Sequence, residues 1–153
     1  VQTHFGGDWT RAMSLVRPLL ESASAAFGNL ESPLESPLAQ QNSPHSHSRN
    51  GSSNNSHDSI DLRAHLKAVG ALKSFDFLST ENNHAQDGGA AGAAQNLAWL
   101  QQHGLIPVSS QVAWSVIERH QVAWLAFLDD PQQPTTQHAA WLNQVRQARA
   151  KAH

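Results

Sequence analysis

The sequence predicts an all-α protein: a small helical bundle with a flexible Ser/Asn/His-rich linker and an N-terminal amphipathic helical arm. Two observations lead to this fold class. Apolar residues recur at spacings of three and four along most of the 153 residues, which is typical of amphipathic helices. No sustained alternation of apolar and polar residues indicates a strand. We therefore expect an arm over residues 1–29, a disordered linker over residues 30–58 and a bundle over residues 59–153.

The arm begins with a helix N-cap signal. Asp8 follows two glycines, and its carboxylate can accept hydrogen bonds from the exposed N–H groups of a first turn. Pro18 removes one backbone donor, so the helix over residues 8–29 should kink or break there. Its apolar stripe consists of Trp9, Met13, Val16, Leu20, Ala23 and Phe27.

The segment that follows has a different composition. Two Glu-Ser-Pro-Leu repeats, at 31–34 and 35–38, are followed by a tract rich in Ser, Asn and His. Residues 40–58 contain no Leu, Ile, Val, Phe or Trp, so they offer no apolar surface to offset the entropy lost on ordering. This composition predicts a flexible linker over residues 30–58.

The first half of the bundle should hold two helices. A stripe of apolar residues predicts the first over residues 59–78, followed by a polar loop over residues 79–89. The Ala-rich segment 90–103 predicts the second, and Gly104 is the glycine expected just past its end.

The second half should hold two more helices. Residues 111–128 place apolar side chains around about half of a helical wheel, and Trp114 and Leu125 widen that face. Such a helix is either central to the core or pressed against a partner. The final helix should start at Thr135 or Thr136, with Trp141 on its apolar face.

His120 falls inside the apolar arc of the segment 111–128. A buried imidazole can act as a general base or a pH switch, but a structural core histidine is the more ordinary interpretation. No carboxylate lies three or four residues away to orient it. We therefore predict no catalytic residue.

The composition excludes several classes of function. The absence of cysteine excludes disulfides and thiolate metal sites, and a formal charge of −2 disfavours a dedicated nucleic-acid binder. No apolar run is long enough to cross a bilayer, so we expect no membrane partner. No phosphate-binding loop, serine elbow or zinc-protease motif is present. The sequence thus predicts a protein that is not an enzyme and has neither cofactor nor metal.

These features favour a helical protein–protein interaction module, a subunit or accessory of a larger assembly. Its partner would be another protein or a second copy of the chain, because tryptophan is enriched where interfaces are tightest. No targeting signal indicates a compartment, and the cytoplasm is favoured. The expected partner-binding residues are Trp9, Met13, Val16, Leu20, Trp114 and Leu125.

A second hypothesis gives the basic end of the last helix a role. Arg146, Arg149 and Lys151 could contact nucleic acid or an acidic partner. They could equally complement the negative end of the helix dipole. The alternative function is therefore a nucleic-acid-associated accessory protein.

Overall fold

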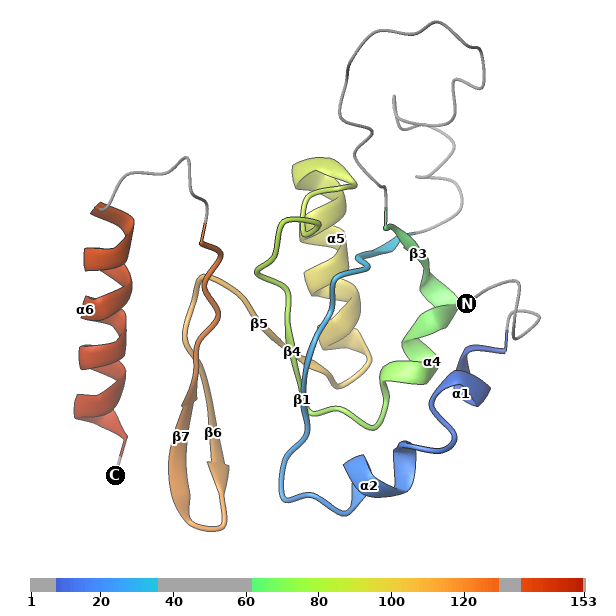
Figure 1. The fold of residues 1–153 in the computed structure, drawn as a ribbon, viewed down its shortest axis with the longest axis horizontal. Helices are drawn as coiled ribbons and strands as arrows, with labels where there is room; N and C mark the ends of the chain where they lie inside the picture. The colour runs from blue at the N-terminus through green and yellow to red at the C-terminus, as the bar shows by residue number, and fades with distance from the viewer. Residues whose placement is uncertain (1–7, 36–61, 130–135, 153) are drawn as a thin grey trace, which may run out of the picture.

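The chain has an α/β fold, so the predicted all-α class is wrong (Figure 1). The computed structural model describes residues 8–35, 62–129 and 136–152. Its helices are α1 (Trp9–Ala12), α2 (Arg17–Glu21), the 3-10 turn η1 (Leu66–Ala68), α4 (Val69–Leu72), α5 (Gly89–Gln102) and α6 (Thr136–Lys151). Its strands are β1 (Phe27–Asn29), β2 (Leu34–Glu35), β3 (Ala64–His65), β4 (Phe77–Ser79), β5 (Ile106–Val108), β6 (Ala113–Ile117) and β7 (His120–Trp124).

Three parallel strands in the order β1-β4-β5 form the central sheet. The helix α5 connects β4 to β5, as a parallel pair requires a crossover. A second parallel pair joins β2 to β3, and β6 and β7 form an antiparallel hairpin. All three strands of the central sheet therefore end at the same edge.

Each face of the central sheet packs against a different layer. In β4, Leu78 faces a core shared with Leu34 and with Leu100 of α5, while Phe77 faces the hairpin. Trp124 of β7 stacks on Phe77 with ring centroids 4.2 Å apart. Figure 1 shows the sheet between α5 and the hairpin. The alternation of side chains along a strand thus divides the apolar residues between two cores.

The segment 111–128 is a hairpin and not the predicted helix. Glu118 and Arg119 form its two-residue turn with φ values of 48° and 76°. Turns of this type usually contain Asn or Gly, so the sequence carried no hairpin signal. Ala113 pairs with Trp124, so the two strands lie side by side as a short hairpin. Apolar residues on both faces of such a hairpin produce the same sequence pattern as a helix with a wide apolar face.

The predicted helices over residues 8–29 and 59–78 are also wrong over most of their length. The first breaks into α1 and α2, with Pro18 in the first turn of α2, and ends in β1. The second is divided among β3, η1, α4 and β4. Sheet pairing overrides helical spacing here, because Leu78 and Phe77 of β4 pack on the two sides of the sheet and Phe27 of β1 stacks on Trp124.

Two predicted helices are present. The helix α5 ends in a Schellman motif in which Leu105 N–H bonds to Leu100 O at 3.0 Å and Gly104 N–H to Gln101 O at 3.1 Å. Gly104 has the expected positive φ of 79°. The helix α6 begins at Thr136, and its Ala148 is buried.

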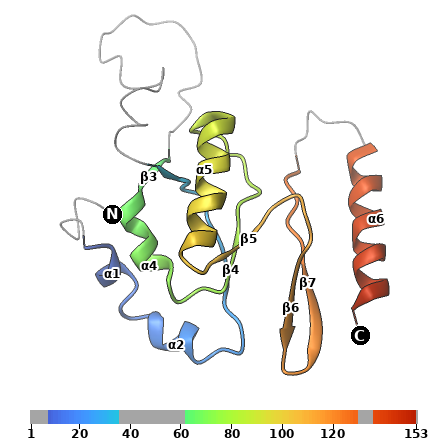
Figure 2. The same ribbon diagram turned by 180° about the vertical axis from the view of Figure 1, so that it is seen from behind.

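The predicted linker 30–58 lies mostly outside the described residues, which stop at 35 and resume at 62. Its first residues pack within the fold: Leu34 is buried, and its N–H bonds to the buried Asn96 side chain at 3.0 Å. The N-terminal helices α1 and α2 lie on the α4 side, away from α6, in both views (Figures 1 and 2). No helix in the described part of the chain is long and apolar enough to cross a membrane.

Candidate functional site

Polar side chains gather where the parallel strands end. Asn29 is the last residue of β1, and Thr80 to His84 follow β4 directly. The adjacent strands are linked at this edge, since Leu30 N–H bonds to Ser79 O and Thr80 N–H to Val108 O, both at 2.9 Å. Open α/β sheets bind ligands outside the carboxyl ends of their strands. This edge of the sheet is therefore the expected location of a ligand-binding or catalytic site.

Asn82 joins the two strand ends. Its amide Nδ2 donates to Asn29 Oδ1 at 3.2 Å and to Leu30 O at 3.0 Å. Its Oδ1 accepts from the backbone N–H of His84 at 3.1 Å. Only 9% of the Asn82 surface is exposed, so this side chain is structural. It fixes the backbone from which the His84 side chain projects.

His84 and Asp87 form a half-buried pair. The imidazole Nδ1 lies 3.0 Å from Asp87 Oδ2, and the two side chains are 20% and 17% exposed. The same carboxylate oxygen accepts the backbone N–H of Leu62 at 2.9 Å. A backbone bond from a distant segment thus holds the carboxylate in place for the imidazole.

This geometry selects the histidine tautomer. An ionised carboxylate can only accept, so Nδ1 carries the proton and Nε2 is the nitrogen left to take up or release one. Among the described residues, none bonds to Nε2. An imidazole oriented by a carboxylate is suited to general acid–base catalysis. The pair can therefore move a proton to or from a bound molecule.

A second pair provides a comparison. His138 Nε2 lies 3.0 Å from Asp129 Oδ1, but these side chains are 53% and 73% exposed. Exposed pairs of this kind contribute little because water competes for both groups. The pair at His84 differs in its burial and in the backbone N–H that positions its carboxylate.

The described residues contain no group of three His, Cys, Asp or Glu side chains placed to hold a metal ion. His84 and Asp87 are two such side chains, and the amide group of Asn82 is already engaged in structural hydrogen bonds.

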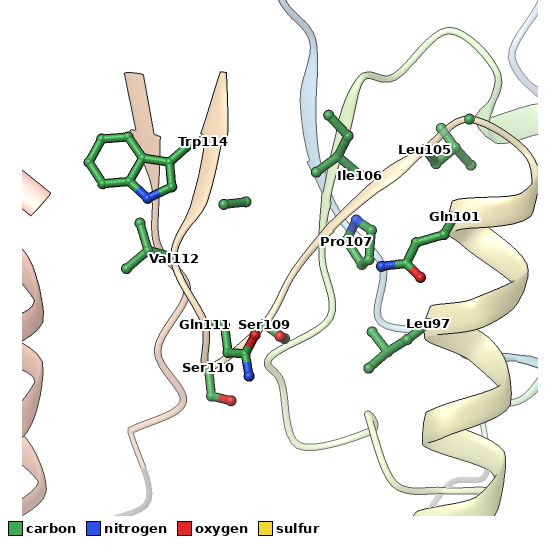
Figure 3. Close-up of a pocket in the computed structure, with 12 residues that line it drawn as sticks. Leu97, Gln101, Leu105, Ile106, Pro107, Ser109, Ser110, Gln111, Val112 and Trp114 are labelled. Atoms are coloured by element: carbon green, nitrogen blue, oxygen red, sulfur yellow. The ribbon is translucent and has the colours of Figure 1, made fainter. Parts of the chain in front are cut away.

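A groove of about 690 Å³ lies along β5, between α5 and the start of β6. Figure 3 shows Leu97 and Gln101 reaching from α5 toward Pro107, with Ser110 and Gln111 on the other side. A smaller cavity of about 90 Å³ lies under α6, lined by Glu81 and Trp141 among others. Ser110 lines both spaces.

The predicted partner-binding residues occupy two separate regions. Met13, Val16 and Leu20 lie along the α1–α2 segment, and Val16 is 45% exposed. Trp9 begins α1, and nothing is described of its side chain. Trp114 lies on β6 and Leu125 just after β7, both half-buried. Their role in binding stays a prediction.

The remaining predicted residues lie on the surface. Arg146, Arg149 and Lys151 are exposed along the C-terminal half of α6. His120 opens β7 and is exposed, not enclosed in the apolar arc of a helix. None of these residues belongs to the edge described above.

The polar edge itself was missed. The segment 79–89 reads as a polar loop, and Asn29 as the end of a helix. A signal was available: Asn29 follows Phe27-Gly28, and Asn82-Asn83-His84 follow the short apolar run Phe77-Leu78. Asn29 is itself the last residue of β1, and Asn82 lies two residues beyond Thr80, the residue that follows β4.

Comparison with known proteins identifies a family. The family model described as "Bacterial capsule synthesis protein PGA_cap" matches residues 2–152. No curated protein and no solved structure matches. The match overturns the predicted function, because capsule synthesis is neither the role of a generic helical interaction module nor that of a nucleic-acid accessory protein.

Proposed function

The chain belongs to the PGA_cap family of bacterial capsule synthesis proteins, and we propose that it is an enzyme of that process in which His84 transfers a proton at the polar edge of the sheet. The reaction would make or break a bond in the capsule polymer or in its precursor. His84 acts as the general acid or base through Nε2, and Asp87 orients it through Nδ1.

The observation that supports this proposal most strongly is the way Asp87 is held. Its Oδ2 accepts from both His84 Nδ1 and Leu62 N–H, so the carboxylate cannot turn away without losing a backbone bond. Catalytic groups need such support from their neighbours, since small errors in position cost large factors in rate. Asn82 provides comparable support to the His84 backbone.

The experiment compares two histidines in the native host. His84→Gln removes the imidazole at the proposed site, and His138→Gln removes the imidazole of the exposed pair. Loss of a general acid or base typically reduces a rate by about 10²- to 10⁴-fold. We therefore expect His84→Gln to lower the rate of capsule polymer formation by about 10²- to 10⁴-fold, leaving a residual rate, and His138→Gln to leave the rate at the wild-type level.

The amount of folded protein must be equal in the two strains, measured by immunoblot of the soluble fraction and by thermal denaturation of the purified chains. Wild-type capsule levels in the His84→Gln strain would refute the proposal. Equal losses in both strains would refute it too, because the two histidines would then share a property unrelated to the site.

A further inference from the structure

We propose that the small cavity under α6 binds a primary ammonium group, carried either by a small free amine or by the lysine side chain of a peptide. The cavity measures about 90 Å³ and lies where α6 packs against the rest of the fold. In both views α6 runs beside the hairpin (Figures 1 and 2). The site is independent of the proposed function, since neither His84 nor Asp87 lines the cavity.

Glu81 gives the cavity a negative charge. Among the eight described residues that line the space, it is the only Asp, Glu, Lys, Arg or His. Its side chain is half-buried, and no hydrogen bond or ion pair joins its carboxylate to another residue in the described part of the chain. Removing a carboxylate from water without a partner costs free energy, and a bound cation would recover it. The lining therefore favours a cationic ligand.

Two glutamine amides supply the other acceptors that an ammonium group needs. Gln144 Nε2 donates to Ser110 O at 3.2 Å, and this bond leaves Oε1 of the same amide as an acceptor. Gln137, the second residue of α6, makes no side-chain hydrogen bond to the described residues. With the Glu81 carboxylate, the two amide oxygens match the three N–H donors of a primary ammonium group.

Two aromatic rings line the same cavity. Phe127 and Trp141 contact each other with ring centroids 5.1 Å apart and planes tilted by 32°. The faces of aromatic rings attract cations, and tryptophan attracts them most strongly. Ala126 and Leu128 complete an apolar surface that suits a short alkyl stem. One carboxylate beside two rings favours an ammonium group over a hard metal ion such as Ca²⁺, which takes about six to eight oxygen ligands.

The volume limits the ligand to a small group. A water molecule occupies about 30 Å³ in the liquid, so the cavity holds about three atoms of that size, such as an ammonium nitrogen and two methylene groups. The N-terminal end of α6, near Gln137, carries about half a positive charge, which is less than the full charge of Glu81. An α-amino acid should bind more weakly than a simple amine, because its carboxylate would meet Glu81 and none of the described lining residues is a cation.

The test is a titration of the full chain with ethylammonium and with Nα-acetyl-lysine methylamide at constant ionic strength, followed by NMR of the Gln144 side-chain amide and the Trp141 indole. Glycine is the amino-acid probe, and tetramethylammonium is a cation that lacks N–H donors and exceeds the cavity in size. We expect at least one of the two amines to bind and to shift both signals. Glycine and tetramethylammonium should bind at least about tenfold more weakly. The amine that binds more tightly identifies the source of the ammonium group.

Three variants connect the binding to the cavity. Glu81→Gln keeps the shape of the side chain but removes its charge, and it should weaken amine binding by about tenfold or more, because a hydrogen bond to a charged group is lost. Glu21→Gln makes the same change on the exposed surface of α2 and should leave the affinity unchanged. Gln137→Ala removes one acceptor and should weaken binding by about 2- to 10-fold. It keeps the test decisive if thermal denaturation shows that Glu81→Gln does not fold.

Absence of binding by both amines would overturn the proposal. Equal affinity for glycine or tetramethylammonium would overturn it too, as would wild-type affinity in a folded Glu81→Gln variant. His84→Gln separates this site from the proposed function, because it should lower polymer formation and retain the wild-type affinity for the amine. Either proposal can therefore fail without the other.

Discussion

Replacing Asn82 with alanine should destabilise the whole edge of the sheet. The side chain is 9% exposed and makes three hydrogen bonds, two from Nδ2 and one to Oδ1. Each such bond contributes about 0.5–1.5 kcal/mol, and a buried partner left unpaired costs about 1–3 kcal/mol. Asn29 is exposed and can bond to water instead, whereas Leu30 O belongs to an 8% exposed residue. We therefore expect a loss of about 2–3 kcal/mol in the free energy of unfolding.

Urea denaturation followed by tryptophan fluorescence measures this loss. With a denaturant slope of about 1–3 kcal/mol per molar, the midpoint should fall by about 0.7–3 M. The neighbouring Asn83 is exposed, and Asn83→Ala should change stability by less than about 0.5 kcal/mol. If the two alanine variants unfold at the same urea concentration, Asn82 does not tie the strand ends together, and the reasoning about the site scaffold is wrong.

Three further changes test the packing of the sheet and of the hairpin. Gly28→Ala should lower the melting temperature, because an added Cβ would lie 2.9 Å from the Phe75 ring. The control is Gly92→Ala, in the helix α5. Arg119→Gly should raise the free energy of unfolding by about 0.5–1 kcal/mol. Glycine adopts the positive φ of this turn without strain, and this gain is larger than the cost of the extra conformational entropy that glycine gives the unfolded chain. Arg119→Ala should show no such gain in the same melt. Trp124→Ala should cost about 3–5 kcal/mol, because it removes the ring stacked on Phe77; a smaller loss in urea would mean that the hairpin is not part of the core.

The elements that the sequence predicted correctly are those with local signals. The helix α5 is long, rich in alanine and closed by Gly104, whose positive φ is the conformation that glycine tolerates best. The helix α6 is also long, and Trp141 and Ala148 on one side of it contact the rest of the fold. Neither prediction needed knowledge of what lies beside the helix.

The strands were missed because their signals are not local. Strands β1, β4 and β5 contain three residues each, too few to establish an alternating pattern. The hairpin has Glu118-Arg119 in a turn that usually contains Asn-Gly. The site depended on these strands: Asn29 and Asn82 are far apart in sequence and meet only because β1 pairs with β4. Once the strands were taken for helices, their ends could not be recognised as one edge.

The most direct test of the account is a double-mutant cycle on the capsule polymer formed by strains carrying His84→Gln, Asp87→Asn or both. If Asp87 acts by orienting His84, Asp87→Asn should reduce polymer formation in the wild-type background and cause no further loss once His84 is gone. Equal amounts of folded protein in all strains make the comparison valid. Losses that multiply in the double variant, or wild-type output from either single variant, would contradict the claim that the two side chains act together in proton transfer.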